Sequence, residues 1–197
     1  MVPYNSKYLR RRTSAPQDLM NLPNSLTVLR ILLIPFLVGF LMYGFYGWAL
    51  VTLLVAGLTD ILDGVIARLA NQRTKLGAYL DPLADKLLLT TAFATLSILH
   101  LVPGWVAIVI VSRDLIIVAG TLLLHMTQTP IEVVPSVLGK GTTLAQLTYL
   151  VLALGLIYLQ KDLGQLILLR HTMLVLTVAS GLHYIYRGIR AYHPDLV

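Results

Sequence analysis

Hydrophobic positions are grouped into six long stretches, and short polar segments separate them. Each stretch has about 20 residues, enough for an α-helix to cross a bilayer core of about 30 Å. Backbone amides inside a bilayer must be satisfied within their own segment, so these stretches predict helices and exclude an open sheet. The predicted spans cover residues 25–44, 46–70, 77–100, 103–125, 139–160 and 164–187. Asn24 or Ser25 is expected to cap the first helix.

Basic residues mark one side of the predicted spans. That side collects the following residues: Lys7, Arg10, Arg11, Arg12, Arg68, Arg73, Lys75, Lys140, Arg187 and Arg190. The other side carries only Lys161 and Arg170. By the positive-inside rule both termini are expected to be cytoplasmic, in the inner membrane if the source is bacterial. The predicted organisation is a basic arm over 1–20, one membrane domain over 21–190 and a cytoplasmic tail over 191–197.

Composition supports an all-α, polytopic membrane protein with six transmembrane helices. Hydrophobic residues make up 57% of the chain and charged residues 12%, about half the charged fraction of a soluble domain. The net charge of +6 could indicate nucleic acid, but basic residues at span ends are better explained by anionic lipid headgroups. Membrane lipids are therefore expected partners and nucleic acid is not. The absence of cysteine excludes disulfides, thiolate nucleophiles and cysteine metal sites.

Four of the nine acidic residues fall at the ends of two consecutive spans: Asp60, Asp63, Asp81 and Asp85. A carboxylate at membrane depth costs at least a few kcal/mol. Four such groups together indicate either a bound cation or a catalytic role. The alternative is a set of buried carboxylates satisfied at a helix crossing.

The helical spacing of these acids predicts two stripes that face each other. The first stripe consists of Asp60, Asp63, Gly64 and Ala67, and the second of Gly77, Asp81 and Asp85. A tight turn over 71–76 would make the two helices antiparallel neighbours. Four carboxylates across such a pair suit two Mg²⁺ or Mn²⁺ ions, which can clamp a phosphoryl group during transfer. Small residues beside the acids would leave room for a phosphate or a base.

The full pattern is Asp60-x-x-Asp63-Gly64-x-x-Ala67-Arg68, eight residues, Gly77-x-x-x-Asp81-x-x-x-Asp85. It resembles the signature of the CDP-alcohol phosphatidyltransferase family at every fixed position. The similarity extends to four further segments: Pro23 to Arg30, Asp81 to Lys86, Ser112 to Asp114, and Gly139 to Thr143. The resemblance implies six spans and an active site open to the cytoplasm. It also implies a metal-dependent enzyme that transfers the phosphatidyl group of CDP-diacylglycerol to an alcohol and releases CMP.

The resemblance also implies roles for single residues. Asp60, Asp63 and Asp81 would be the main metal ligands, and Asp85 would share a metal and act as the general base. The cytidine diphosphate pocket would be lined by Gly64, Ala67, Arg68 and Gly77. The acceptor hydroxyl, deprotonated by Asp85, would attack the phosphoryl group nearer the diacylglycerol. Catalysis would then rest on positioning and electrostatics.

Three basic residues are predicted to bind the phosphate of the acceptor: Arg113, Lys140 and Arg30. An intramembrane arginine is a functional candidate, and its guanidinium binds phosphate through a bidentate fork. A mutual ion pair of Arg113 with Asp114 is a weaker explanation, because neighbouring helix residues do not face each other. The alternatives are an interfacial anchor for Lys140 and, for Arg30, a side chain that extends to the headgroups.

The acceptor is the less determined part of the reaction. Asn71-Gln72-x-Thr74 and the Arg113/Lys140 pair look like the branch of the family that makes phosphatidylglycerol phosphate from glycerol 3-phosphate. Ala56 to Asp60 and Ser112 to Asp114 are also similar to the CMP-forming cardiolipin synthases, whose acceptor is phosphatidylglycerol. Glycerol 3-phosphate is the favoured expectation, followed by phosphatidylglycerol and then by inositol phosphate or serine. An intramembrane prenyltransferase and a cation transporter are the rivals from other classes, and a homodimer is left open.

Overall fold

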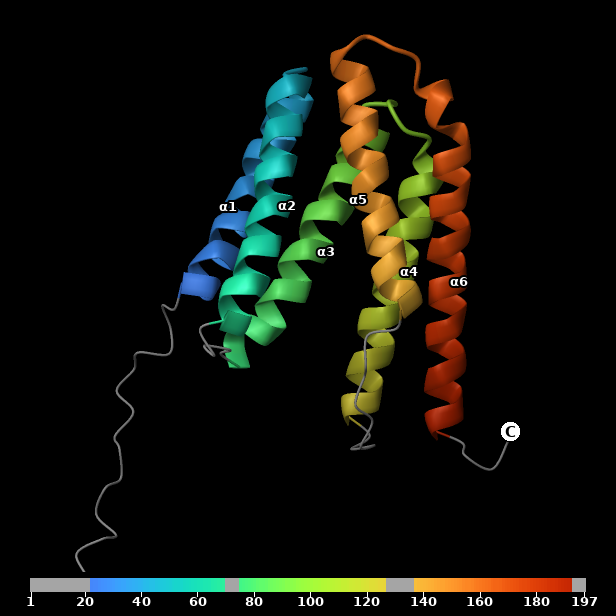
Figure 1. Ribbon diagram of the computed structural model, residues 1–197. Coiled ribbons are helices and arrows are strands. Elements are labelled where there is room, and N and C mark those ends of the chain that lie inside the picture. The colour runs from blue at the N-terminus through green and yellow to red at the C-terminus, as the bar shows by residue number, and fades with distance from the viewer. Residues whose placement is uncertain (1–21, 70–74, 127–136, 193–197) are drawn as a thin grey trace, which may run out of the picture.

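A computed structural model describes residues 22–69, 75–126 and 137–192. Within these ranges the chain forms long α-helices, one short 3₁₀ helix and no strand. The elements are α1 (Leu22–Met42), α2 (Tyr46–Leu69), α3 (Lys75–Ile98), α4 (Gly104–Met126), α5 (Val137–Tyr158), η3 (Leu163–Leu166) and α6 (Ile167–Tyr192). The predicted all-α class is confirmed for the described part of the chain (Figure 1). The basic arm over 1–20 and most of the predicted tail lie outside the described residues.

The helix boundaries follow the predicted spans closely, with two differences. The first helix begins at Leu22, so the predicted cap at Asn24 or Ser25 was wrong. Pro23 fits the first turn of the helix, where a backbone amide has no intrahelical partner to lose. The last helix begins later than predicted, because residues 163–166 form the 3₁₀ turn. Asp162 caps that turn, its Oδ1 accepting a hydrogen bond of 2.9 Å from the amide of Gly164.

Three described helical segments are long and apolar enough to cross a membrane: Ser25–Met42, Leu138–Tyr158 and Leu163–Gly188. A shorter apolar segment covers Tyr46–Asp60. Large hydrophobic side chains are exposed along the outside of the bundle, among them Phe36, Leu58, Ile108, Leu115 and Leu168. An apolar exterior of this kind is what a lipid environment requires. The structure therefore supports a membrane protein.

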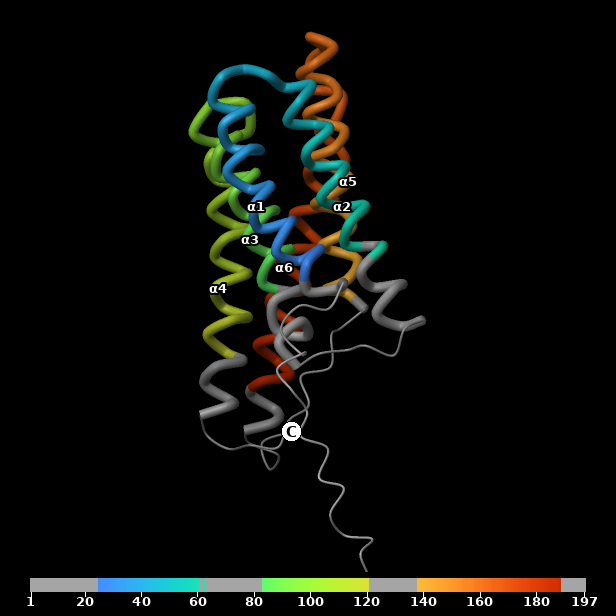
Figure 2. The backbone as a smooth tube through the Cα atoms, turned by 90° about the vertical axis from the view of Figure 1, so that its left-hand side faces the viewer, coloured from blue at the N-terminus to red at the C-terminus, as the bar shows by residue number. Residues whose placement is uncertain are grey.

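The six α-helices of the described chain are arranged as three hairpins in a ring. The hairpins are α1–α2, α3–α4 and α5–α6, and each pairs two helices that are consecutive in the chain. The ring closes through contacts of α2 with α5, of α6 with α4 and of α3 with α1. All three hairpin turns lie at one end of the bundle, and the C-terminal end of α6 lies at the other (Figures 1 and 2). α1 therefore packs against both α2 and α3.

The three hairpin turns begin with the same backbone structure. After α1, the amide of Phe45 donates to the carbonyl of Phe40 at 2.8 Å and the amide of Gly44 to that of Leu41 at 3.1 Å. This is the Schellman motif, which needs one residue in the left-handed conformation. Gly44 takes that position after α1 with φ 75°, and His100 and Gln160 take it after α3 and α5 with φ 58° and 54°. Two of the three turns thus use a residue that carries a Cβ.

The core of the bundle lies inside the ring. Its fully buried side chains include Leu37, Leu53, Phe93, Tyr149 and Leu150. Phe93 of α3 and Tyr149 of α5 stack across the interior, with ring centroids 6.0 Å apart and planes 10° from parallel. This apolar packing holds α3 in place, and α3 carries two of the predicted site aspartates.

Candidate active site

Arg30 of α1 joins two of the predicted metal ligands. Its Nη2 lies 2.9 Å from Oδ1 of Asp60 in α2, and its Nη1 donates to Oδ1 of Asp85 in α3, also at 2.9 Å. The arginine side chain is fully buried, whereas those of Asp60 and Asp85 are 40% and 34% exposed. The alternative in which Arg30 extends to the headgroups is therefore wrong. Two acids that were predicted to lie on different helices therefore bind the same guanidinium group.

The remaining residues of the predicted signature lie on the same two helices. Asp63, Gly64, Ala67 and Arg68 belong to the last turns of α2, and Gly77 and Asp81 to the first turns of α3. Their side chains lie outside the described set, so their roles stay predictions. Among the side chains that are described, no group of three or more potential ligands is assembled for a metal. The described side chains do not include two of the four predicted ligands, Asp63 and Asp81.

The described acids have the chemistry that a hard divalent cation needs. Asp60 and Asp85 bring two negative charges against the single positive charge of Arg30. Both carboxylates keep accessible surface, while the guanidinium beside them is closed off. Mg²⁺ and Mn²⁺ bind carboxylate oxygens and complete their shells with water or phosphate oxygens. The residues present therefore fit the predicted metal site.

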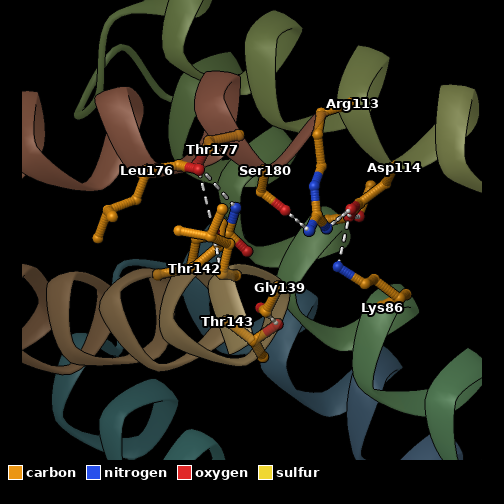
Figure 3. A network of polar contacts seen from close by, with 12 residues as sticks. Lys86, Arg113, Asp114, Gly139, Thr142, Thr143, Leu176, Thr177 and Ser180 are labelled. Atoms are coloured by element: carbon orange, nitrogen blue, oxygen red, sulfur yellow. Dashed lines mark hydrogen bonds and ion pairs between the residues drawn. The ribbon is translucent and has the colours of Figure 1, made fainter. Parts of the chain in front are cut away.

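A second polar cluster joins α3, α4 and α6 (Figure 3). Oδ1 of Asp114 lies 2.8 Å from Nζ of Lys86 and accepts a hydrogen bond of 2.7 Å from Nη1 of Arg113. Nη2 of Arg113 donates to Oγ of Ser180 at 2.6 Å. The expectation that Arg113 and Asp114 do not form a mutual ion pair was wrong. The arginine side chain is long enough to turn back along α4 and reach its neighbour.

Arg113 is almost completely enclosed, being 6% exposed. Its Nε is buried and has no hydrogen-bond partner among the described residues. A Cβ on Gly181 would come within 3.3 Å of Cγ of Arg113, so the glycine leaves room for the arginine stem. Lys140 is exposed in the first turn of α5. The three residues predicted for the acceptor phosphate thus lie in three different surroundings.

The polar interior continues between α5 and α6. Nε2 of Gln146 donates to Oγ1 of Thr177 at 3.3 Å, and Oγ1 of Thr142 donates to the carbonyl of Leu176 at 3.1 Å (Figure 3). Gln146 is fully buried, and its Oε1 has no partner within the described part of the chain. The third hairpin therefore adds neutral polar groups next to the charged groups of the other two.

Comparison with known proteins identifies the family. The model of the CDP-alcohol phosphatidyltransferases matches residues 20–182, which include both clusters. The chain belongs to this family. The resemblance drawn from the aspartate signature is confirmed at the level of the family.

Relatives within the CDP-alcohol phosphatidyltransferases carry two different names. A probable phosphatidylglycerophosphate synthase of Mycobacterium tuberculosis is 33% identical over 183 residues, covering 86% of this chain and 82% of the relative. A probable CMP-forming cardiolipin synthase of Drosophila melanogaster is 32% identical over 155 residues, covering 71% of this chain and 48% of the relative. The human CMP-forming cardiolipin synthase is 40% identical over 110 residues, covering 55% of this chain and 36% of the relative. The chain thus spans about half or less of these two cardiolipin synthases.

Sequence reasoning gave no role to three residues of this family member that the structure places in the second cluster. They are Lys86, Ser180 and Gly181. Lys86 could have been noticed because it is a lysine inside a predicted span and directly follows an acid of the signature. Ser180 and Gly181 could have been noticed because they are adjacent small residues in a span, where small residues let neighbouring groups approach closely.

Proposed function

We propose that this CDP-alcohol phosphatidyltransferase transfers the phosphatidyl group of CDP-diacylglycerol to glycerol 3-phosphate and releases CMP. The observation that carries the proposal is the meeting of Asp60 and Asp85 on Arg30, within the family signature. The name of the mycobacterial relative, which covers most of both chains, supports glycerol 3-phosphate as the acceptor.

Four aspartates would hold the metal, which we propose to be two Mg²⁺ or Mn²⁺ ions: Asp60, Asp63, Asp81 and Asp85. When bound, such ions neutralise charge that develops on the diphosphate. The CDP moiety would lie against Gly64, Ala67, Arg68 and Gly77. Arg30, buried behind the carboxylates, fixes the orientation of Asp60 and Asp85.

Asp85 would act as the general base. A carboxylate oxygen of Asp85 takes the proton of the acceptor hydroxyl, whose oxygen forms a bond to the phosphorus nearer the diacylglycerol. The bond from that phosphorus to the CMP oxygen breaks, and CMP leaves with the electron pair. Oδ1 of Asp85 accepts a hydrogen bond from Nη1 of Arg30, so the guanidinium would orient the carboxylate that serves as the base.

The acceptor phosphate would be bound by Arg113 together with Lys140, whereas the guanidinium of Arg30 is fully buried against Asp60 and Asp85. The best-supported alternative is a CMP-forming cardiolipin synthase with phosphatidylglycerol as the acceptor, which the names of other relatives favour. Family membership gives no support to a cation transporter.

We further propose that all six helices cross the membrane with both termini in the cytoplasm. The helix ends that carry the aspartates lie at the same end of the bundle as the end of α6 (Figure 1). That end also carries Arg68, Lys75 and Arg187, whereas Lys161 lies at the other. The basic end is therefore the end expected to face the cytoplasm.

The direct test is release of CMP by purified protein supplied with CDP-diacylglycerol, Mg²⁺ and one acceptor at a time. We expect CMP and phosphatidylglycerol phosphate with glycerol 3-phosphate, and little product with phosphatidylglycerol, inositol phosphate or serine. Product with phosphatidylglycerol alone would establish the cardiolipin synthase alternative. A protein that releases CMP with none of the acceptors would contradict the proposal.

A further inference from the structure

The two charged clusters have opposite net charges. Counted over the described side chains, Arg30 between Asp60 and Asp85 is one cation against two anions. Lys86 and Arg113 around Asp114 are two cations against one anion. The first cluster therefore carries a net negative charge suited to a metal ion, and the second a net positive charge suited to an anion.

Lys86 makes the difference in the second cluster. Arg113 and Asp114 alone would form a neutral pair, because their charges cancel at 2.7 Å. Nζ of Lys86 binds the same oxygen, Oδ1 of Asp114, at 2.8 Å. Asp114 has one negative charge against the two positive charges of Lys86 and Arg113, so one positive charge remains. The Lys86 side chain is 29% exposed and that of Arg113 only 6%, so solvent screening is weaker at the arginine.

Among the described residues, Asp114 is the acid that forms ion pairs with Lys86 and Arg113. Oδ2 of Asp114 accepts a hydrogen bond from the neutral hydroxyl of Thr90, at 3.5 Å. Nη2 of Arg113 faces the neutral hydroxyl of Ser180. Asp85, which precedes Lys86 in the chain, is bound by Arg30, and it attracts Lys86 less strongly than Asp114 does. The excess positive charge is therefore not cancelled by the described groups in contact with the cluster.

We propose that Lys86 is a positioning residue for the acceptor, because it neutralises Asp114 and so leaves the charge of Arg113 available to a phosphate. The inference rests on the proposed function in assuming that the acceptor carries a phosphate. It differs from a purely structural role for Lys86, in which the ion pair with Asp114 only joins α3 to α4. The positioning role and the structural role predict opposite effects on glycerol 3-phosphate binding when both Lys86 and Asp114 are replaced by neutral residues.

The test is a charge series in the full-length protein, read out by the dissociation constant of glycerol 3-phosphate. Lys86→Gln makes the cluster neutral and should weaken binding about tenfold or more, since one unscreened charge near the ligand is lost. Lys86→Gln combined with Asp114→Asn restores the net positive charge and should return binding to within about threefold of wild type. Lys161→Gln, the same change in an exposed turn at the other end of the bundle, should have less than about a twofold effect.

The inference is overturned if Lys86→Gln binds glycerol 3-phosphate as wild type does, or if the double variant binds no better than Lys86→Gln. It is also overturned if the wild type binds no glycerol 3-phosphate. Should Lys86→Gln fail to fold, Asp114→Asn decides: the added net charge should tighten binding, and unchanged or weaker binding contradicts the inference. Turnover is measured separately. Wild-type protein that binds glycerol 3-phosphate without releasing CMP would contradict the proposed function and leave the charge series as the test of Lys86.

Discussion

Asp85 and Lys86 are consecutive in α3, and their charged groups bind different helices. Oδ1 of Asp85 lies 2.9 Å from Nη1 of Arg30 in α1, and Nζ of Lys86 lies 2.8 Å from Oδ1 of Asp114 in α4. Successive residues of an α-helix point about 100° apart, so a single turn of α3 reaches both neighbours. The proposed general base and the proposed positioning residue are thus fixed by the same piece of backbone.

The first prediction concerns the metal. Asp60→Asn, Asp63→Asn and Asp81→Asn should each abolish CMP release, because a neutral amide is a much poorer ligand for a hard divalent cation. Asp162→Asn is a matched control, since Asp162 is an exposed carboxylate at the opposite end of the bundle, and it should retain activity. Full activity in excess chelator would refute a metal mechanism.

The second prediction separates base from ligand. Asp85→Asn should lower the turnover number by a factor of roughly 10²–10⁴, the usual contribution of a general base. Binding of CDP-diacylglycerol should largely survive, as the other three acids remain. If binding is lost as completely as in Asp60→Asn, Asp85 serves chiefly as a metal ligand.

The third prediction concerns Arg30. Arg30→Met leaves Asp60 and Asp85 as two neighbouring acids without their shared guanidinium, and should lower the unfolding free energy by up to about 3 kcal/mol. Mg²⁺ should raise the melting temperature of this variant more than that of wild type, because a divalent cation can replace the lost counter-charge. Equal Mg²⁺ responses in the two proteins would show that these carboxylates do not bind the ion.

The fourth prediction concerns the acceptor. Arg113→Ala should raise the Michaelis constant for glycerol 3-phosphate steeply, since a charge-assisted contact of about 1.5–3 kcal/mol is lost. The constant for CDP-diacylglycerol should change far less, because that substrate is expected to bind the aspartates. Equal losses for both substrates would mean that Arg113, through Asp114 and Ser180, supports the fold.

The fifth prediction concerns the hairpin turns. Gln160 holds the left-handed position of its Schellman motif with φ 54°, a conformation that costs a residue with a Cβ about 1–2 kcal/mol. Gln160→Gly should stabilise the protein by about 0.5–1 kcal/mol after allowing for the freer unfolded chain. Thermal unfolding in detergent would detect this as a rise of roughly 1–4 °C. Gly44→Ala, the reverse change in the equivalent turn, should lower the melting temperature.

The sequence was sufficient for the helices and for bringing Asp60 and Asp85 close together. Apolar stretches of membrane length fix each helix within a few residues, because a bilayer demands both length and internal hydrogen bonding. The signature spacing predicted that Asp60 and Asp85 come together from two facing helices. They do come together, but through Arg30 of α1, against which α2 and α3 each pack. The contribution of α1 could not be predicted. Helical spacing shows which residues share one face of a helix, but it does not show which other helix packs against that face. Arg30 was accordingly expected near the acceptor or the headgroups.

The contacts of Arg113 show the same limitation at the level of a side chain. Helical geometry separates the backbone directions of Arg113 and Asp114, but it does not limit where a long flexible stem can fold. The space for that stem comes from Gly181, which is distant in sequence. The packing of α6 against α4 brings Gly181 next to Arg113.

The division into three hairpins also bears on how the protein is built in the bilayer. The first hairpin contains both Arg30 and Asp60, and the second contains both Lys86 and Asp114. With all six helices across the membrane, as we propose, each of these two hairpins can be inserted with an internal partner for its cation, which avoids the cost of exposing a lone charge to lipid. The third hairpin presents Ser180 and Gln146, which are neutral. The contacts of Arg30 with Asp85 and of Arg113 with Ser180 cross between hairpins, so they form only when the inserted pairs associate. Biogenesis in this order would complete the site last.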